Sequence, residues 1–167
     1  MYATGHESQN ELPKINHRFK DVKTDGNSNL MPNSVLLGVG LFRVVDSLLG
    51  LGKNVVLVMD VPEIGFEAKD LLFVGRMKRD GYYNLLPNRT YYEKRNEDVK
   101  ILFSKLAINQ NVTIINPGSI LFDKNQVTII TNSNDIFYRD DDHLSSYGAR
   151  FIAPLFDDVF REMSKKL

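Results

Sequence analysis

Two short apolar runs, separated by a long helical pattern, limit the folds that this chain can adopt. The first run covers residues 54–62 and the second covers residues 112–115, and both are rich in β-branched side chains, as are strands buried on both faces. Between them, apolar residues recur at helical spacing from about residue 90 to residue 108: Tyr92, Val99, Leu102, Phe103 and Leu106. A strand, a helix and a second strand predict a βαβ crossover, and therefore a parallel sheet with helices on its faces.

Further patterns surround this crossover. Residues 34–52 read as a helix that begins with a serine N-cap and stops at a glycine. Shorter β segments are expected at 126–131 and 135–138, and a final amphipathic helix at 151–163, kinked near Pro154. The prediction is an α/β fold with a three-layer arrangement, in which helices flank a parallel sheet.

The domain organisation follows from the same patterns. Residues 1–33 are polar without sustained periodicity and are expected to form a loop or arm, whereas residues 34–167 form part of a single α/β domain. Two strong strands and two marginal ones serve three helices, so the sheet is expected to be incomplete at one edge. Because an apolar strand left at an open edge promotes aggregation, we expect that edge to be completed by a missing segment or by another chain.

Composition excludes several classes of function. Lys plus Arg equals Asp plus Glu at 21 each, so net charge gives no indication of a nucleic-acid partner. The chain has no cysteine, which excludes disulfides, thiolate catalysis and cysteine-based zinc sites. No apolar run reaches the roughly 20 residues that span a bilayer, and no secretory signal is visible. Gly38 and Gly40 follow no strand, so no dinucleotide cofactor is predicted.

The acidic run from Asp140 to Asp142, followed by His143, is the main candidate site. It lies in the loop between the last predicted strand and the final helix, and ligands of parallel α/β sheets gather at such strand ends. Asp140 is spaced to orient the ring of His143, which would then act as a general base. Two other readings stay open: a solvated turn in which Asp142 or Ser145 caps the helix, and a divalent-metal site on carboxylate oxygens.

The residues around this run carry a family resemblance. The segment 137–150 contains Asp-x-x-His continued as His-Leu-Ser and Gly-Ala, and it resembles the last motif block of SGNH hydrolases. It is most similar to the C-terminal extracytoplasmic domain of bacterial membrane acyltransferases (acyltransferase family three) that O-acylate surface polysaccharides. Residues 52–63 and the Asn-Pro-Gly at 116–118 resemble earlier parts of that domain, so the resemblance covers roughly residues 34–160. It implies an SGNH or flavodoxin-like fold, and a Ser-His-Asp triad with Asp140 as acid and His143 as base.

Two departures from the family pattern shape the expected function. The family's nucleophile lies in Gly-Asp-Ser after the first strand, and this chain has no Gly-Asp-Ser; the nearest imitation, residues 5–8, follows no apolar strand. The family's cysteine pair before the last block is also absent. We therefore expect the chain to begin partway through the domain, with the serine upstream, and to be inactive alone.

The resemblance implies a hydrolase or O-acyltransferase of cell-surface glycans in the bacterial envelope, on its extracytoplasmic (periplasmic) side. An acyl donor and a glycan acceptor would be its substrates, and an upstream membrane acyltransferase domain would complete it. The alternatives are a non-catalytic glycan-binding module that keeps the fold without turnover, and the divalent-metal site at the acidic loop.

Overall fold

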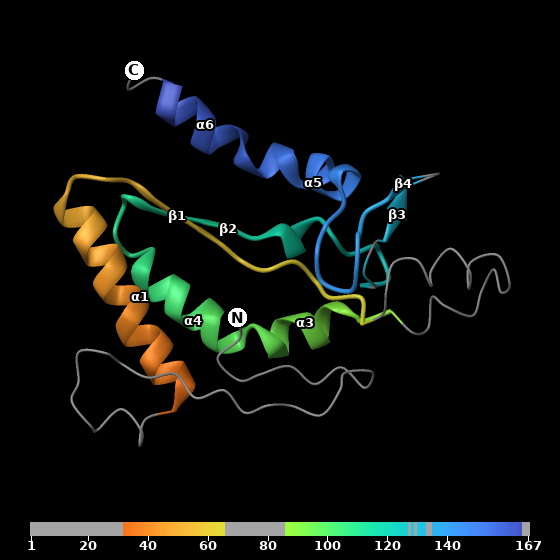
Figure 1. Cartoon of the computed structure of the whole chain (residues 1–167), viewed down its shortest axis with the longest axis horizontal. Coiled ribbons are helices and arrows are strands. Elements are labelled where there is room, and N and C mark those ends of the chain that lie inside the picture. Colours follow the sequence, from red (N-terminus) through yellow and green to blue (C-terminus); the bar gives the residue numbers. More distant parts are fainter. Residues whose placement is uncertain (1–31, 66–85, 127, 129, 133–134, 165–167) are drawn as a thin grey trace, which may run out of the picture. The chain divides into compact units, whose positions relative to one another are not determined.

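The structure is a computed structural model that describes residues 32–65, 86–126, 128, 130–132 and 135–164 (Figure 1). Nearly all of the predicted polar arm, and the candidate nucleophile at residues 5–8, lie outside these residues. The predicted start of the domain at residue 34 stays a prediction.

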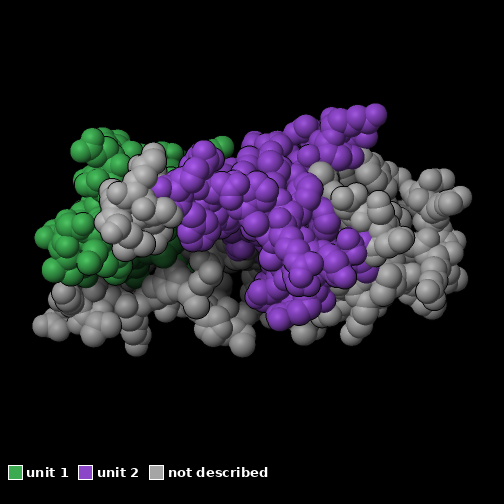
Figure 2. Space-filling view, turned by 90° about the horizontal axis from the view of Figure 1, so that it is seen from above, with its two compact units in different colours: residues 1–57, 95–114 green, residues 58–94, 115–167 purple. Residues whose placement is uncertain are grey.

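The chain divides into two compact units (Figure 2). The first consists of residues 1–57 and 95–114, and the second of residues 58–94 and 115–167. Each unit has its own hydrophobic core.

The described part of the first unit consists of two helices and most of a two-stranded sheet: α1 (Asn33–Gly50), β1 (Val55–Val58), α4 (Glu97–Leu106) and β2 (Val112–Ile115). Its core contains Val45 from α1, Leu106 from α4 and the strand residues Val55, Leu57 and Val112. The helix predicted at 34–52 and the strand predicted at 112–115 are confirmed, but the predicted serine cap is wrong, because the helix begins after Pro32 and has no side-chain cap. The strand predicted at 54–62 ends earlier, at Val58, before an extended segment that leads to Pro62.

The two strands of this sheet run parallel. The backbone N–H groups of Val55 and Met59 donate to the carbonyl oxygens of Asn111 and Ile115, each at 2.8 Å. From the first bond to the second, the donor moves four residues along the chain and the acceptor also moves four residues in the same direction, so the two strands are parallel. The predicted α/β class and the parallel strand pair are therefore confirmed, whereas the three-layer arrangement stays a prediction.

Among the described residues, α1 alone is long and apolar enough to cross a membrane, judged by length and composition. A mostly buried core helix of a soluble protein passes the same test, but only 11% of the window in α1 is buried. Leu36 and Val45 of α1 are buried, while Arg43 and Asp46 interrupt its apolar sequence. These features are those of an amphipathic helix with one face in a core.

The second unit is built mainly from short elements: α3 (Arg89–Arg95), the 3-10 turn η3 (Pro117–Ser119), β3 (Thr131–Asn132), β4 (Asp135–Ile136), α5 (Ser146–Ile152), the 3-10 turn η4 (Ala153–Phe156) and α6 (Asp157–Ser164). β3 and β4 pair antiparallel. The core residues are Ile64, Leu86, Leu121, Ile130, Phe137 and Tyr138, with Leu144, Phe151 and Ile152 packed against them. The predicted kink at Pro154 is confirmed, because a 3-10 turn separates α5 from α6 there.

Two sequence predictions of secondary structure are wrong in part. The single helix predicted from 90 to 108 is two helices, because Asn96 is buried with φ −94° and ψ 7°, outside the α-helical well. Asparagine favours such breaks, since its side chain competes for backbone hydrogen bonds. The strand predicted at 126–131 cannot begin at Gln126, whose φ of 63° places it in a turn. Among its described residues, the pairing consists of a bridge between Thr128 and Phe122 and of the short strand β3.

Candidate acid–base site

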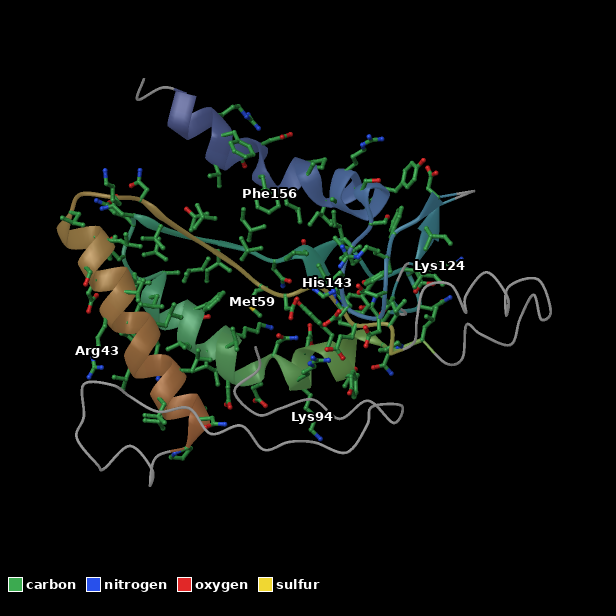
Figure 3. The ribbon with its side chains drawn as sticks, in the orientation of Figure 1. Arg43, Met59, Lys94, Lys124, His143 and Phe156 are labelled. Atoms are coloured by element: carbon green, nitrogen blue, oxygen red, sulfur yellow. The ribbon has the colours of Figure 1, made fainter. Side chains whose placement is uncertain are left out.

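The acidic run forms a tight loop at the end of a hairpin-like pairing. Tyr138 and Leu144 form an antiparallel bridge, and the N–H of Arg139 donates to the carbonyl oxygen of His143 at 2.8 Å. Residues 139–143 are therefore the loop between β4 and α5, as the sequence predicts, and Figure 3 labels His143 in it.

Asp140 and His143 meet inside this loop. Oδ1 of Asp140 lies 2.9 Å from Nδ1 of His143, which is the geometry expected of a carboxylate that fixes the tautomer and orientation of an imidazole. The same oxygen accepts the backbone N–H of His143 at 2.8 Å and that of Asp142 at 3.3 Å. The Arg139 guanidinium approaches the other oxygen, Oδ2, at 3.3 Å. Asp140 is thus held by its own loop.

These contacts determine the charge of Asp140. Burial alone would raise the pKa of the Asp140 carboxyl, but the hydrogen bonds from His143, Asp142 and Arg139 outweigh it and hold that pKa well below its usual range. Its side chain is only 25% exposed. Asp140 is therefore a fixed carboxylate across the physiological pH range.

A second carboxylate shares the same ring nitrogen. Oδ1 of Asp142 lies 2.7 Å from Nδ1 of His143. Burial raises the pKa of the Asp142 carboxyl, although the charge of His143 opposes the shift. The pKa of His143 is raised, first by its hydrogen bond to Asp140 and then by the charge of Asp142. Sequence reasoning missed this contact of Asp142, although its place one residue before His143 was a signal for it.

The other ring nitrogen of His143 is open. Within the described part of the chain, the side-chain contacts of His143 all involve Nδ1, and the side chain is 62% exposed. Nε2 is therefore accessible to an external proton donor. An imidazole held by a carboxylate on one side and open on the other can act as a general base.

The helix-capping reading is confirmed for Ser145. Its Oγ accepts the backbone N–H groups of Tyr147 and Gly148, both at 3.2 Å, at the start of α5. The same hydroxyl donates to the carbonyl oxygen of Ile136 at 2.5 Å, and the Ser145 N–H donates to that of Phe137 at 2.8 Å. Since its hydroxyl is fully used in these bonds, Ser145 is a structural residue rather than a nucleophile.

The same three acidic and imidazole groups could also hold a metal ion. Ligand atoms of Asp140, Asp142 and His143 lie within 4.8 Å of one another. A metal on Nδ1 would displace the proton that Nδ1 gives to Asp140, because only the unprotonated nitrogen binds a metal. Metal binding at Nδ1 and the Asp140–His143 hydrogen bond therefore exclude each other.

The contacts of His143 predict its titration. Its raised pKa means that protonated His143 stabilises the fold below pH 6.5 or so, and that this contribution is lost as pH rises through the folded pKa. The lowered pKa of Asp140 adds stability above roughly pH 4, which is lost as pH falls through its folded value.

NMR titration of the His143 ring should show a pKa above 6.5 or so, and this pKa should fall in Asp140→Asn. An unshifted pKa, or ring signals that move on adding Mg²⁺ or Mn²⁺ at neutral pH, would contradict the acid–base reading.

Comparison with known proteins identifies the family of the chain. A family model described as the SGNH domain (fused to AT3 domains) matches residues 1–158. The chain belongs to this SGNH domain family. The match extends the predicted resemblance, which covered residues 34–160, to the first residue. No curated protein and no solved structure matches the chain significantly. Membership in the SGNH family supports an acyl-related function and an association with an acyltransferase domain.

Proposed function

We propose that this SGNH domain supplies the acid–base pair of an acyl-ester enzyme, a hydrolase or an O-acyltransferase, whose serine comes from a segment outside the described residues. The single observation that carries the proposal is the Asp140–His143 pair, bonded at Nδ1 and open at Nε2. Membership in a family of SGNH domains fused to acyltransferase domains supports the reaction class.

The chemistry assigns one role to each group. The serine Oγ attacks the acyl carbonyl and gives its proton to Nε2 of His143, while Asp140 stabilises the resulting imidazolium. His143 then protonates the leaving oxygen, and an acyl-serine ester remains. In the second half, His143 takes the proton of a water or a sugar hydroxyl, which attacks the ester and carries the acyl group away. His143 finally returns the proton to the serine.

The proposed acceptor is a glycan of the bacterial cell surface, and the modification is O-acylation, such as O-acetylation. The proposed location is the extracytoplasmic side of the envelope, next to a membrane acyltransferase domain. Both proposals derive from the motif resemblance in residues 137–150 and from the fusion that the family description names. Sugar hydroxyls are weak nucleophiles, so a general base at the position of His143 suits such an acceptor.

The exposed face of β1 supports completion of the sheet by further segments. Val55 and Leu57 are buried, whereas Val56 and Val58 are 38% and 45% exposed. Strands of parallel sheets are normally covered on both faces, and two strands alone make a marginal sheet. We propose that the complete enzyme adds a strand beside this pair and covers the second face, which gives the three-layer arrangement.

Ester hydrolysis tests the proposed function directly. A fusion of the chain to an SGNH amino-terminal block that carries Gly-Asp-Ser (the fusion enzyme) should hydrolyse p-nitrophenyl acetate, and the unfused chain should not. His143→Ala should lower kcat of the fusion enzyme by at least about 10³-fold, because the general base is lost. Tyr147→Phe, at an exposed position of α5, serves as the matched control and should leave kcat unchanged.

Two outcomes would contradict the proposal. Hydrolysis by the unfused chain that survives His143→Ala would show that another residue provides catalysis. Glycan binding without turnover in the fusion enzyme, unaffected by His143→Ala, would identify the chain as the non-catalytic binding module instead.

A further inference from the structure

The segment that follows β1 holds the loop of His143 at two points. The carbonyl oxygen of Pro62 accepts the hydroxyl of Tyr138 at 2.6 Å. Two residues later, the backbone N–H of Ile64 donates to the carbonyl oxygen of Asp141 at 2.8 Å. Pro62 and Ile64 are almost fully buried, so residues 62–64 are a firm support rather than a surface strand.

The two points lie at the base and at the tip of the loop. Tyr138 directly precedes residues 139–143 and pairs with Leu144 across the base. Asp141 lies at the tip, between the two carboxylates that contact His143. A loop held at one point can pivot, whereas a loop held at its base and its tip by one buried segment keeps its orientation.

Tyr138 is well suited to hold such a position. Its side chain is 2% exposed, within the core of the second unit. Burial raises the pKa of the Tyr138 hydroxyl far above its usual range, so this hydroxyl is a hydrogen-bond donor at neutral pH. Breaking this bond would leave a buried hydroxyl and a buried carbonyl oxygen without partners. Because that costs free energy, the bond stays formed.

We propose that Tyr138 is a positioning residue for His143: its hydroxyl bond to Pro62, together with the Ile64–Asp141 bond, sets the orientation of the acid–base loop relative to residues 62–64. Tyr138 touches no reacting atom and acts through the loop. The geometric part of this inference concerns the unfused chain, and its catalytic consequence rests on the proposed function.

A second buried tyrosine provides a matched control. The hydroxyl of Tyr92 donates to the carbonyl oxygen of Asp60 at 2.8 Å, with Oδ1 of Asn116 at 2.9 Å, and the side chain is 6% exposed. Tyr92 therefore anchors the same stretch of chain two residues earlier, and the two hydroxyl partners named here, Asp60 and Asn116, lie outside residues 139–143. Tyr92→Phe and Tyr138→Phe each remove one buried hydroxyl, so they should cost similar stability while differing in their effect on His143.

The Nδ1 proton of His143 in the unfused chain, observed by NMR at a pH where the ring is protonated, tests the inference. In Tyr138→Phe this signal should move upfield and exchange at least tenfold faster with water, because a loop released at its base opens more often and breaks the Asp140–His143 bond when it opens. In Tyr92→Phe it should stay at its wild-type position. Replacing Tyr138 with 4-aminophenylalanine, which keeps a donor, should restore the wild-type signal. Equal effects of the two Phe variants, or no effect of Tyr138→Phe, would overturn the inference.

Native-state hydrogen exchange of the wild-type chain supplies a measurement that needs no variant. The amide protons of Ile64 and Arg139, which bond to the tip and the base of the loop, should exchange through one common opening. An Ile64 amide that exchanges 100-fold faster than that of Arg139 would show that residues 62–64 do not hold the loop.

In the fusion enzyme, Tyr138→Phe should lower kcat about tenfold with KM unchanged, since only the orientation of His143 is lost. A fusion enzyme without activity would overturn the proposed function and leave both NMR results as they stand.

Discussion

Asp140→Asn is expected to lower kcat of the fusion enzyme by about 10⁴-fold, the loss that asparagine at the orienting position causes in a Ser-His-Asp triad. Asp142→Asn should lower kcat by less than about tenfold, although Asp142 lies slightly closer to Nδ1 of His143. The reason is that Asp140 is fixed in its ionised form by three donor groups. The Asp142 carboxyl has a raised pKa and is more exposed, at 41% against 25% for Asp140.

The pair of variants is its own control, because each removes one negative charge from the same loop. A general loss of loop charge would therefore affect both equally. kcat and KM are measured for both variants between pH 5 and pH 9, so that a shift of the histidine titration is separated from a loss at the plateau. Equal losses would show that the two carboxylates orient His143 jointly, and a larger loss in Asp142→Asn would assign the orienting role to Asp142.

The parts of the fold that sequence predicts well are those with a strong local signal. The β-branched run at 112–115 and the long apolar face of 34–52 each fix one element, and both are present in the structure. The kink at Pro154 follows from the missing backbone N–H of proline. In each case one property of the side chains or the backbone decides the conformation locally.

The parts that sequence misses depend on distant contacts. The break at Asn96 interrupts a continuous helical pattern, and it occurs where the chain passes between the two compact units. Gln126, with its positive φ, has a distant partner, because its carbonyl oxygen accepts the N–H of Arg89 at 2.8 Å. Periodicity carries no information about either, because a buried polar residue and a non-glycine residue with positive φ contradict average preferences.

The candidate site shows the same division. Spacing along the chain predicts the contact of Asp140 with His143, because both lie on one tight loop. The support of that loop by Pro62 and Ile64 joins residues about 76 positions apart, and no local pattern indicates it. A tyrosine before an acidic run reads as an ordinary strand residue until its hydroxyl partner is known.

Gly148→Ala is expected to destabilise the second unit by about 3 kcal/mol, the upper part of the range for overpacking in a rigid site. A Cβ at position 148 would collide with the carbonyl oxygen of Phe137 and lie 2.9 Å from its carbonyl carbon and 3.0 Å from Cδ2 of Leu144. Backbone cannot turn aside as a flexible side chain can. The same carbonyl oxygen accepts the N–H of Ser145, so any shift that makes room for the methyl group also weakens the bond that ties α5 to the strand before the loop.

Gly40→Ala in α1 is the matched control, because a Cβ there meets no atom within 4 Å and alanine is favoured over glycine in a helix by up to about 1 kcal/mol. Urea unfolding followed by far-UV circular dichroism should therefore shift to lower urea for Gly148→Ala and to equal or higher urea for Gly40→Ala. Helix propensity alone would move both variants upward, so the opposite signs isolate the close approach at Gly148. If Gly148→Ala unfolds at the wild-type urea concentration, then α5 does not pack closely against the backbone of Phe137. The loop of His143 would then not be fixed by α5 at its carboxyl end.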